Sequence, residues 1–418
     1  MTLFEPLSNR SLLNDWMTAG VFLLGAISLS VPSGYSYATV ILVLGSIVYL
    51  VRNGLGTLSW EAKLLGASML LYATFWIAES SLRGAGLRAW DEPSRFLFAL
   101  LVLLAFSSGA SVRSWGLWLG IAIGAVTAAL LASWQFFLQD LPRVTGFVGA
   151  DHFGSLAITL GLLSGLGFIR AIALRLSWLY ALLCLLGVFA GLYAALLSGT
   201  RASWGAAAVV AVLLIFLFSR CVKGKRALMA AGGSIVFIGI IWLGFDIATT
   251  GRMTQFVHET RNYFGSGDYE GSISIRFDIW RVAFALFLEK PFLGWGQVAY
   301  GEQMLQAGEQ GVISPFVASI GSSHAHNQIL DALVKRGVIG AAVLLTAYLL
   351  PLFVFVRCLL RSRELDALLL AAAGLIVVIV TMIYGLAHNP LGSHSGVVMY
   401  AFWIAILGGL AFRPQSTY

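Results

Sequence analysis

The sequence predicts an all-α integral membrane protein, and three observations lead to this fold class. Apolar residues make up 59% of the 418-residue chain and charged residues 11%, whereas a typical soluble protein has about 25% charged residues. The mean hydropathy is +0.87, and apolar runs long enough to cross a bilayer recur along nearly the whole chain. A single long polar stretch, 249–325, interrupts them. We therefore expect about twelve transmembrane helices with one large loop outside the membrane.

Each predicted span is an apolar run close to the ~20 residues that a helix needs to cross a bilayer. The first run lacks a basic start and a small-residue cleavage site, so we expect it to remain as a span rather than be removed as a signal. Because the packed spans share one core, we treat residues 1–418 as a single membrane domain, with loop 249–325 inserted between the ninth and tenth spans. The predicted spans are 16–31, 35–51, 62–79, 95–112, 115–137, 154–170, 176–198, 202–219, 227–248, 337–356, 366–384 and 396–412.

Lys and Arg residues indicate how these spans are oriented. With both termini in the cytoplasm, the cytoplasmic segments hold fourteen Lys and Arg residues and the short outer loops hold five, which is the bias that the positive-inside rule requires. The formal net charge of +7 then follows mostly from topology, and no nucleic-acid partner is needed to explain it. In this orientation all six histidines and loop 249–325 lie outside. Histidine exchanges protons near neutral pH, so we expect the chemistry on that side.

The outer loop 249–325 contains two distinct parts. A Gly-rich stretch, 265–272, is predicted to be flexible. Residues 276–290 follow with the period of an amphipathic helix, and Pro291 ends it. Long ordered loops tend to carry function; the alternative is a simple spacer, against which the helical period and the aromatic content argue.

Outward-facing arginines are candidates for binding phosphate. Arg is a planar fork that holds phosphate oxygens in a bidentate manner and keeps its charge. Arg201 lies at a tight turn between two spans, where a charge is usually tied to a partner or a function; the alternative is an Arg that reaches lipid headgroups. Arg143 allows the same two interpretations. Arg276 begins the loop helix and is our preferred site residue there, whereas Arg281 is predicted to form an ion pair or lie on the surface.

The segment that begins at His326 is predicted to be helical. Ser322 or Ser323 would cap a helix beginning near His324 or His326, and Asp331 and Lys335, four residues apart, would pair. Gly337 and Gly340 would allow close packing where the chain enters the next span. In the first turn of that helix the positive helix end would keep the imidazole of His326 neutral, as a general base must be. The alternative is a histidine that merely forms a hydrogen bond at the membrane interface.

Several common catalytic motifs are absent from the sequence. No Asp-x-Asp, His-Glu-x-x-His, P-loop or Gly-x-Ser-x-Gly occurs. A zinc site built from His324, His326, His388 and His394 is conceivable, but no carboxylate or thiol completes an obvious set. We therefore expect neither a metal nor another cofactor.

Taken together, these residues resemble the signature of the O-antigen ligase/polymerase superfamily. His326-Asn327 is followed after nine intervening residues by Gly337 and, after two more intervening residues, by Gly340. The Ser-x-x-Arg turn at Arg201, the pair Arg276 and Trp280, the segment 291–296 (Pro-Phe-Leu-Gly-Trp-Gly) and residues 143–147 also fit. One departure is Gly205, where ligases often have Leu; it affects the choice of subfamily more than that of the superfamily.

This resemblance implies transfer of a glycan at the periplasmic face of a bacterial inner membrane. The donor would be O-antigen polysaccharide on undecaprenyl diphosphate, and in ligases the acceptor is a sugar hydroxyl of lipid A-core; membrane lipids would surround the protein. The superfamily acts without a metal. Arg201 and Arg276 match its diphosphate-binding arginines, and His326 matches its essential histidine. Arg143, His324, Asn327, Trp280 and Arg281 are expected in supporting roles.

The implied mechanism assigns a role to each type of group. His326 would take the proton of the acceptor hydroxyl as it attacks the anomeric carbon, and the arginines would stabilise the leaving diphosphate. Because no second nucleophile is evident, we expect inversion at that carbon. Three other functions stay open: an O-antigen or exopolysaccharide polymerase, a protein O-oligosaccharyltransferase and a membrane transporter. Transport would favour charges within spans and an internal repeat, neither of which is clear here.

Overall fold

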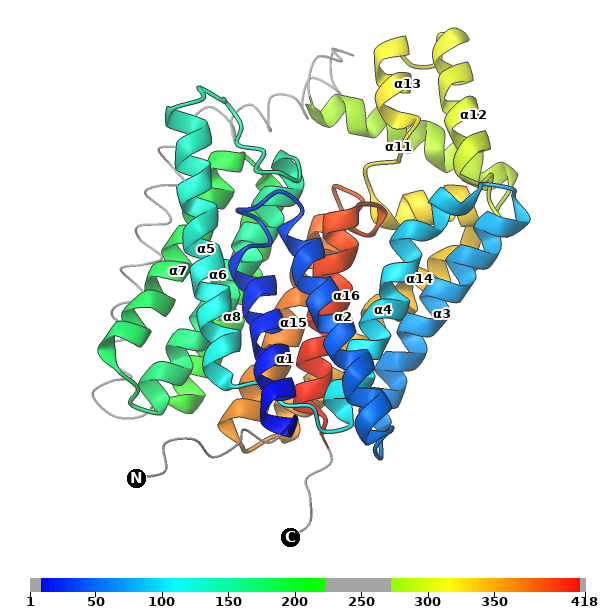
Figure 1. Ribbon diagram of the computed structural model, residues 1–418. Coiled ribbons are helices and arrows are strands. Elements are labelled where there is room, and N and C mark those ends of the chain that lie inside the picture. Colours follow the sequence, from blue (N-terminus) through cyan, green and yellow to red (C-terminus); the bar gives the residue numbers. More distant parts are fainter. Residues whose placement is uncertain (1–8, 223–271, 414–418) are drawn as a thin grey trace, which may run out of the picture.

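The computed structural model describes residues 9–222 and 272–413, and within these ranges every regular element is a helix (Figure 1). This confirms the all-α prediction for the described part of the chain. The elements are α1 (Asn9–Ala26), α2 (Gly34–Asn53), α3 (Trp60–Leu82), η1 (Leu87–Trp90), α4 (Asp91–Ser107), α5 (Ser114–Phe137), α6 (Ala150–Ala173), α7 (Trp178–Ser198), α8 (Arg201–Cys221), α11 (Ser272–Glu289), α12 (Gln297–Glu309), α13 (Pro315–Gly321), α14 (Gln328–Arg361), α15 (Leu365–Gly385), η2 (Pro390–Gly392) and α16 (His394–Ala411).

Eight helices in the described ranges are long and apolar enough to cross a membrane: α2, α5, α6, α7, α8, α14, α15 and α16. Helices α1, α3 and α4 also coincide with predicted spans, but α1 contributes only the shorter apolar stretch Leu12–Ala26. The predicted span 227–248 and the first part of the outer loop, 249–271, lie outside the described residues. The protein is therefore a multi-pass membrane protein, and the count of about twelve spans remains a prediction.

The long helices form one bundle, and α11, α12 and α13 gather at one end of it (Figure 1). Helix α1 begins, and α16 ends, at the opposite end. Nearly every residue of α16 from Ser395 to Gly409 is buried, as expected for a helix that is apolar all round. Helix α15 is buried along most of its length as well. These two helices therefore form the centre of the bundle.

Small residues set the spacing between neighbouring helices. A Cβ atom on Gly191 of α7 would lie 2.6 Å from both the Cα of Gly161 and the carbonyl oxygen of Ala157 in α6. Only a glycine allows backbones to approach this closely, as is common between membrane helices. Helices α6 and α7 consequently present their ends, Ala150 and Ser198, side by side at the end of the bundle that carries α11–α13.

The helix predicted at 276–290 is present as α11, and its apolar face is covered. Ile279, Ala283 and Leu286 are buried against Tyr300 and Met304 of α12. The helix ends at Glu289, just before Pro291, as predicted. Helices α11–α13 thus share a second small hydrophobic core, which makes residues 272–321 an ordered layer rather than a spacer.

The segment 291–296 docks against a kink in α14. At Gly337 the backbone has φ 66°, a conformation that favours glycine. Around it, the amide of Val338 donates to Pro291 (2.8 Å), that of Trp295 donates to Val334 (2.9 Å), and that of Gly296 donates to Lys335 (2.8 Å). The predicted close packing at Gly337 is confirmed, and its partner is the 291–296 segment. The kink separates the first turns of α14, which carry Asp331 and Lys335, from the part of the helix that runs through the bundle.

Candidate functional site

His326 lies in a short loop between α13 and α14, in the left-handed backbone conformation with φ 49°. The sequence prediction placed it in the first turn of a helix capped by Ser322 or Ser323, and this was wrong. Those hydroxyls donate to carbonyls at the end of α13, and the helix begins at Gln328. Asn327 caps it, since its side-chain oxygen accepts from the amides of Ile329 and Leu330, both at 3.0 Å. An Asn that occupies two amides outcompetes a more distant Ser.

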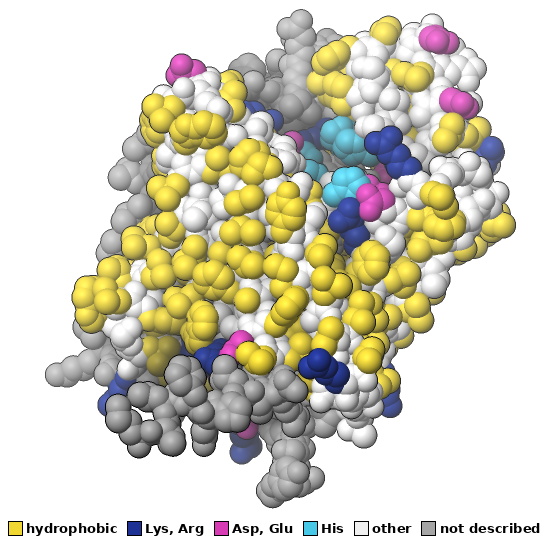
Figure 2. Space-filling view, viewed as in Figure 1, with side chains coloured by type: hydrophobic (Ala, Val, Ile, Leu, Met, Phe, Trp, Pro, Cys, Tyr) yellow, Lys and Arg dark blue, Asp and Glu magenta, His cyan; other side chains and the backbone are white. Residues whose placement is uncertain are grey.

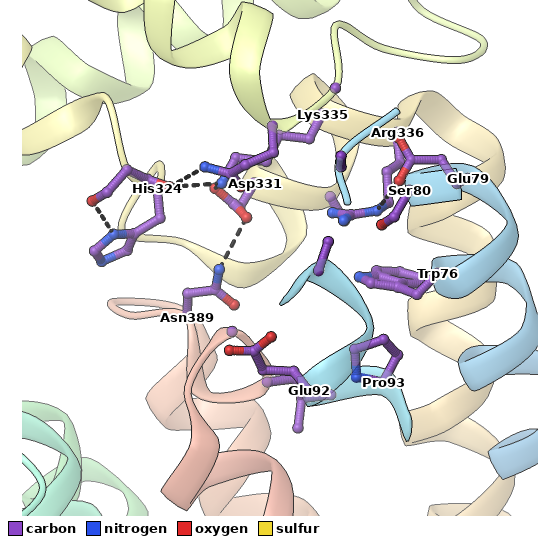
Figure 3. Close-up of a pocket in the computed structure, with 18 of the residues that line it drawn as sticks. Trp76, Glu79, Ser80, Glu92, Pro93, His324, Asp331, Lys335, Arg336 and Asn389 are labelled. Carbon is purple, nitrogen blue, oxygen red and sulfur yellow. Dashed lines mark hydrogen bonds and ion pairs between the residues drawn. The ribbon is translucent and has the colours of Figure 1, made fainter. Parts of the chain in front are cut away.

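A buried ion pair holds this histidine loop in place. Lys335 and Asp331 are both almost fully buried, with 2.7 Å between Nζ and Oδ1, as their spacing predicted. Lys335 also donates to the carbonyl of Ser323 (2.9 Å), while Asp331 accepts from the amide of Ala325 (2.9 Å) and from the side-chain nitrogen of Asn389 (2.9 Å) (Figure 3). The pair therefore fixes the backbone on both sides of His324.

Two further side chains tie the loop to its neighbours. The indole of Trp280 donates to the carbonyl of Ala325 (2.9 Å), and the amide of Asn327 donates to the carbonyl of Leu386 (3.1 Å). A non-glycine residue in the left-handed region costs on the order of 1–3 kcal/mol and persists only where its surroundings enforce it. These contacts enforce it at His326, which is a pattern typical of functional sites.

Loss of the buried ion pair is expected to destabilise the protein. In Asp331→Ala the ammonium of Lys335 stays buried without its partner, which typically costs about 3–5 kcal/mol. We expect a clearly lower Tm in detergent. Asp15→Ala is the matched control, because both partners of its ion pair with Arg113 are exposed, Arg113 at 58% and Asp15 at 41%, and exposed pairs contribute about 0–1 kcal/mol. Equal losses of stability in the two variants would contradict this account of the loop.

Arginines gather on one side of the histidine loop. Arg276 of α11 lies 3.3 Å from Nε2 of His388, and Asp151 of α6 lies 3.7 Å from the same nitrogen. The carboxylate of Asp151 also accepts a hydrogen bond from Arg143 (2.7 Å), and Arg143 in turn donates to the carbonyl of Ser198 (3.0 Å). Burial lowers the pKa of Arg276; the carboxylate of Asp151 opposes this effect, and the positive charges of Arg201 and Arg143 add to it. Three arginine charges therefore act on one another here, and the single carboxylate of Asp151 partly offsets them.

The imidazole of His326 lies close enough to Arg276 for the charge of that guanidinium to act on it. Its ring centre lies 4.1 Å from that of His324 and 6.1 Å from that of His388. Both of its ring nitrogens are buried, yet neither has a hydrogen-bond partner among the described residues. Burial, together with the charges of His324 and Arg276, lowers the pKa of His326 to about 4. The cause is burial rather than the helix end predicted from sequence, but the consequence is the same: a neutral imidazole at pH 7.

The other side of the loop borders a cavity of 820 Å³. Histidines, basic and acidic side chains gather in this hollow beside α11–α13 (Figure 2). Its walls come from the ends of α3 and α4, from α12, from the first turns of α14, from the α15–α16 connection and from His152 of α6. His324 and Asn389 lie at one edge (Figure 3). Trp76 lies beneath the guanidinium of Arg336 at 4.7 Å, and Arg336 pairs with Glu79 at 3.0 Å. The histidine loop therefore stands between an arginine group and a polar cavity.

The structure brings most of the predicted site residues together. His324 and His326 lie beside His388, which contacts Arg276 and Asp151, and Asp151 pairs with Arg143. Arg201 lies close enough to act on the charge of Arg276. Trp280 and Asn327 support the loop through their hydrogen bonds to the carbonyls of Ala325 and Leu386. Arg281 points elsewhere: it is 57% exposed, pairs with Asp278 and donates to the carbonyl of Val312 (2.9 Å), as its predicted surface role requires.

Two residues that contact these arginines, Asp151 and His388, were not predicted from the sequence. Asp151 lies in the first turn of α6 and His388 in the α15–α16 connection. Neither carries a motif, and the sequence suggested only a conceivable zinc site for His388. Its pKa is lowered to about 3, chiefly by burial, so it too is neutral. The one available signal was that both residues follow or precede a span on the same side of the predicted topology.

The four histidines considered for zinc do not form one cluster. His394 lies apart from the other three, 3.3 Å from Asp91 and 3.6 Å from Glu92 of α4. Within residues 9–222 and 272–413, no three His, Cys, Asp or Glu side chains are grouped so that they would hold a metal ion.

The fold and the site together define a multi-pass membrane protein with a histidine and arginines gathered at one end of its bundle. The family described as O-antigen ligase matches residues 186–345, a range that contains Arg201, Arg276 and His326. This match confirms the predicted resemblance to the O-antigen ligase/polymerase superfamily and supports an enzyme of that type. A protein of Haemophilus influenzae, described as uncharacterized, is 25% identical over 381 residues, which cover 89% of this chain and 92% of that protein.

Proposed function

We propose that this protein is a glycosyltransferase that moves O-antigen polysaccharide from undecaprenyl diphosphate to a sugar hydroxyl of lipid A-core. In this proposal the chain is one membrane domain of the bacterial inner membrane, with both termini in the cytoplasm. Loop 249–325 and the site face the periplasm. The observation that carries the proposal is a neutral imidazole at His326 that has no hydrogen-bond partner among the described residues. The charge of Arg276 acts on it, and those of Arg143 and Arg201 act in turn on Arg276.

The proposed chemistry uses the two kinds of group in one step. A lone pair of His326 takes the proton of the acceptor hydroxyl while its oxygen bonds to the anomeric carbon. The bond between that carbon and the diphosphate oxygen breaks, and undecaprenyl diphosphate leaves with the electron pair. Its growing negative charge lies against Arg276 and Arg201. Attack opposite the leaving group inverts the anomeric carbon, so a product with retained configuration would contradict this step.

The depressed pKa of His326 predicts an unusual pH profile. A general base has to be uncharged, so activity is lost only as the pH falls through the pKa of about 4. At pH 5 we expect most of the neutral-pH activity to remain, whereas an ordinary imidazole with a pKa of about 6.5 would be ~97% protonated there. The measurement is kcat/KM against pH, which reports the free enzyme. An acid limb with its midpoint near 6.5, reversible on return to pH 7, would contradict the assignment.

The proposal is tested with purified protein and a lipid-diphosphate-linked glycan, with and without lipid A-core, in the presence of a chelator. Transfer that requires lipid A-core and survives the chelator supports a metal-independent ligase. Longer glycans formed without the core would instead identify a polymerase, and no transfer under any condition would refute the proposal.

A further inference from the structure

The cavity beside His324 differs in charge from the arginine side of the histidine loop. Its lining holds four basic side chains (Arg83, Arg88, Lys335 and Arg336) and four acidic ones (Glu79, Glu92, Asp331 and Glu302), so its formal charge is balanced. The arginine side holds three guanidinium groups against the one carboxylate of Asp151. An anion is therefore bound more favourably on the arginine side. The cavity favours a neutral ligand that both donates and accepts hydrogen bonds.

The cavity has the other properties of a carbohydrate site. Its 820 Å³ lies within the ~300–1,000 Å³ that is usual for pockets that bind small ligands. The ion pairs of Glu79 with Arg83 (2.5 Å) and Arg336 (3.0 Å) hold part of the wall rigidly. Arg88 and Glu302, in contrast, form no ion pair with any residue in the described ranges and are exposed to the cavity. Their charged groups remain available to sugar hydroxyls.

The position of the cavity adds a functional argument. His324 lines it, and its ring lies 4.1 Å from the ring of His326. A hydroxyl that enters from the cavity therefore reaches His324, whose ring lies next to that of the proposed base. Two substrates that meet at His326 need two such approaches, one for a diphosphate and one for an alcohol.

We infer that this cavity binds the uncharged sugar residues of the acceptor, and that the histidine loop separates them from the diphosphate of the donor. The inference rests on the proposed function, since it assigns one of the two substrates to a defined place. Glu302 and Arg88 are the residues that would bind hydroxyl groups of the acceptor directly.

The test compares Glu302→Gln and Arg88→Gln with the wild type in transfer assays in which either substrate is varied. We expect the KM for lipid A-core to rise about tenfold in each variant, as for the loss of a charged hydrogen-bond partner, with the KM for the lipid-diphosphate donor unchanged. Glu309→Gln, the same substitution on the same helix but outside the cavity, should behave as the wild type. A raised donor KM, or no change in either constant, would overturn the inference.

A second measurement separates this inference from the proposed function. Binding of purified lipid A-core to the protein without donor is expected to weaken about tenfold in Glu302→Gln and to stay unchanged in Arg276→Gln. This result is independent of turnover: a wild type that binds the core but transfers nothing would refute the proposed function alone. Binding that is unaffected by Glu302→Gln would refute the acceptor site alone.

Discussion

Replacement of His326 by alanine is expected to reduce the transfer rate by about 10²–10⁴-fold, because a positioned general base contributes that much. The side chain forms no hydrogen bond with a described residue, so its removal leaves no partner unsatisfied. The left-handed backbone at this position is enforced by contacts of neighbouring residues, which the substitution leaves intact. The loss should therefore appear as a lower kcat, with membrane insertion and Tm close to those of the wild type.

His394→Ala is the matched control for this variant. His394 lies at the same end of the bundle but pairs with Asp91 and Glu92 of α4, away from the arginine group. Its removal is expected to leave the transfer rate within a few fold of wild type. Full activity in His326→Ala would remove the general-base role, and an equal loss in both variants would point to a general disturbance of that end of the bundle.

Arg276→Lys should also be severely impaired, with a rate lower by about 10²–10³-fold, as for the loss of one preorganised donor to a developing anion. Lysine keeps the charge but offers a compact ammonium in place of a planar fork. A guanidinium nitrogen of Arg276 also lies 3.3 Å from Nε2 of His388. The variant should lose kcat more than affinity for the acceptor.

Arg281→Lys is the control on the same helix. Its guanidinium is exposed and binds the carbonyl of Val312, so we expect near-normal rates. Comparable rates in Arg276→Lys and the wild type would mean that a point charge is enough at this position. Equal losses of transfer rate in Arg276→Lys and Arg281→Lys would mean that the packing of α11, and not a diphosphate contact, accounts for the loss.

Much of the site was predictable because its residues carry local signals. A lone Arg at a turn between two spans, an Arg at the start of an amphipathic helix and a His-Asn pair before paired glycines are features of the chain itself. The pairing of Asp331 with Lys335 followed from their spacing of four residues, and the structure confirms it. The cap of α14 was misassigned because Ser322, Ser323 and Asn327 are all good capping residues, and only the packing of α13 decides among them.

The amino-acid sequence by itself determined that this protein is a helical membrane protein, because burial in a bilayer requires long apolar runs whatever the tertiary contacts. It also identified the arginines and the histidine as candidates. Only the tertiary structure placed Asp151 and His388 among them, since these residues come from α6 and the α15–α16 connection. It alone showed that burial keeps His326 neutral and that a polar cavity lies behind the histidine loop. Both properties depend on which helices pack together, and no local pattern in the chain encodes that.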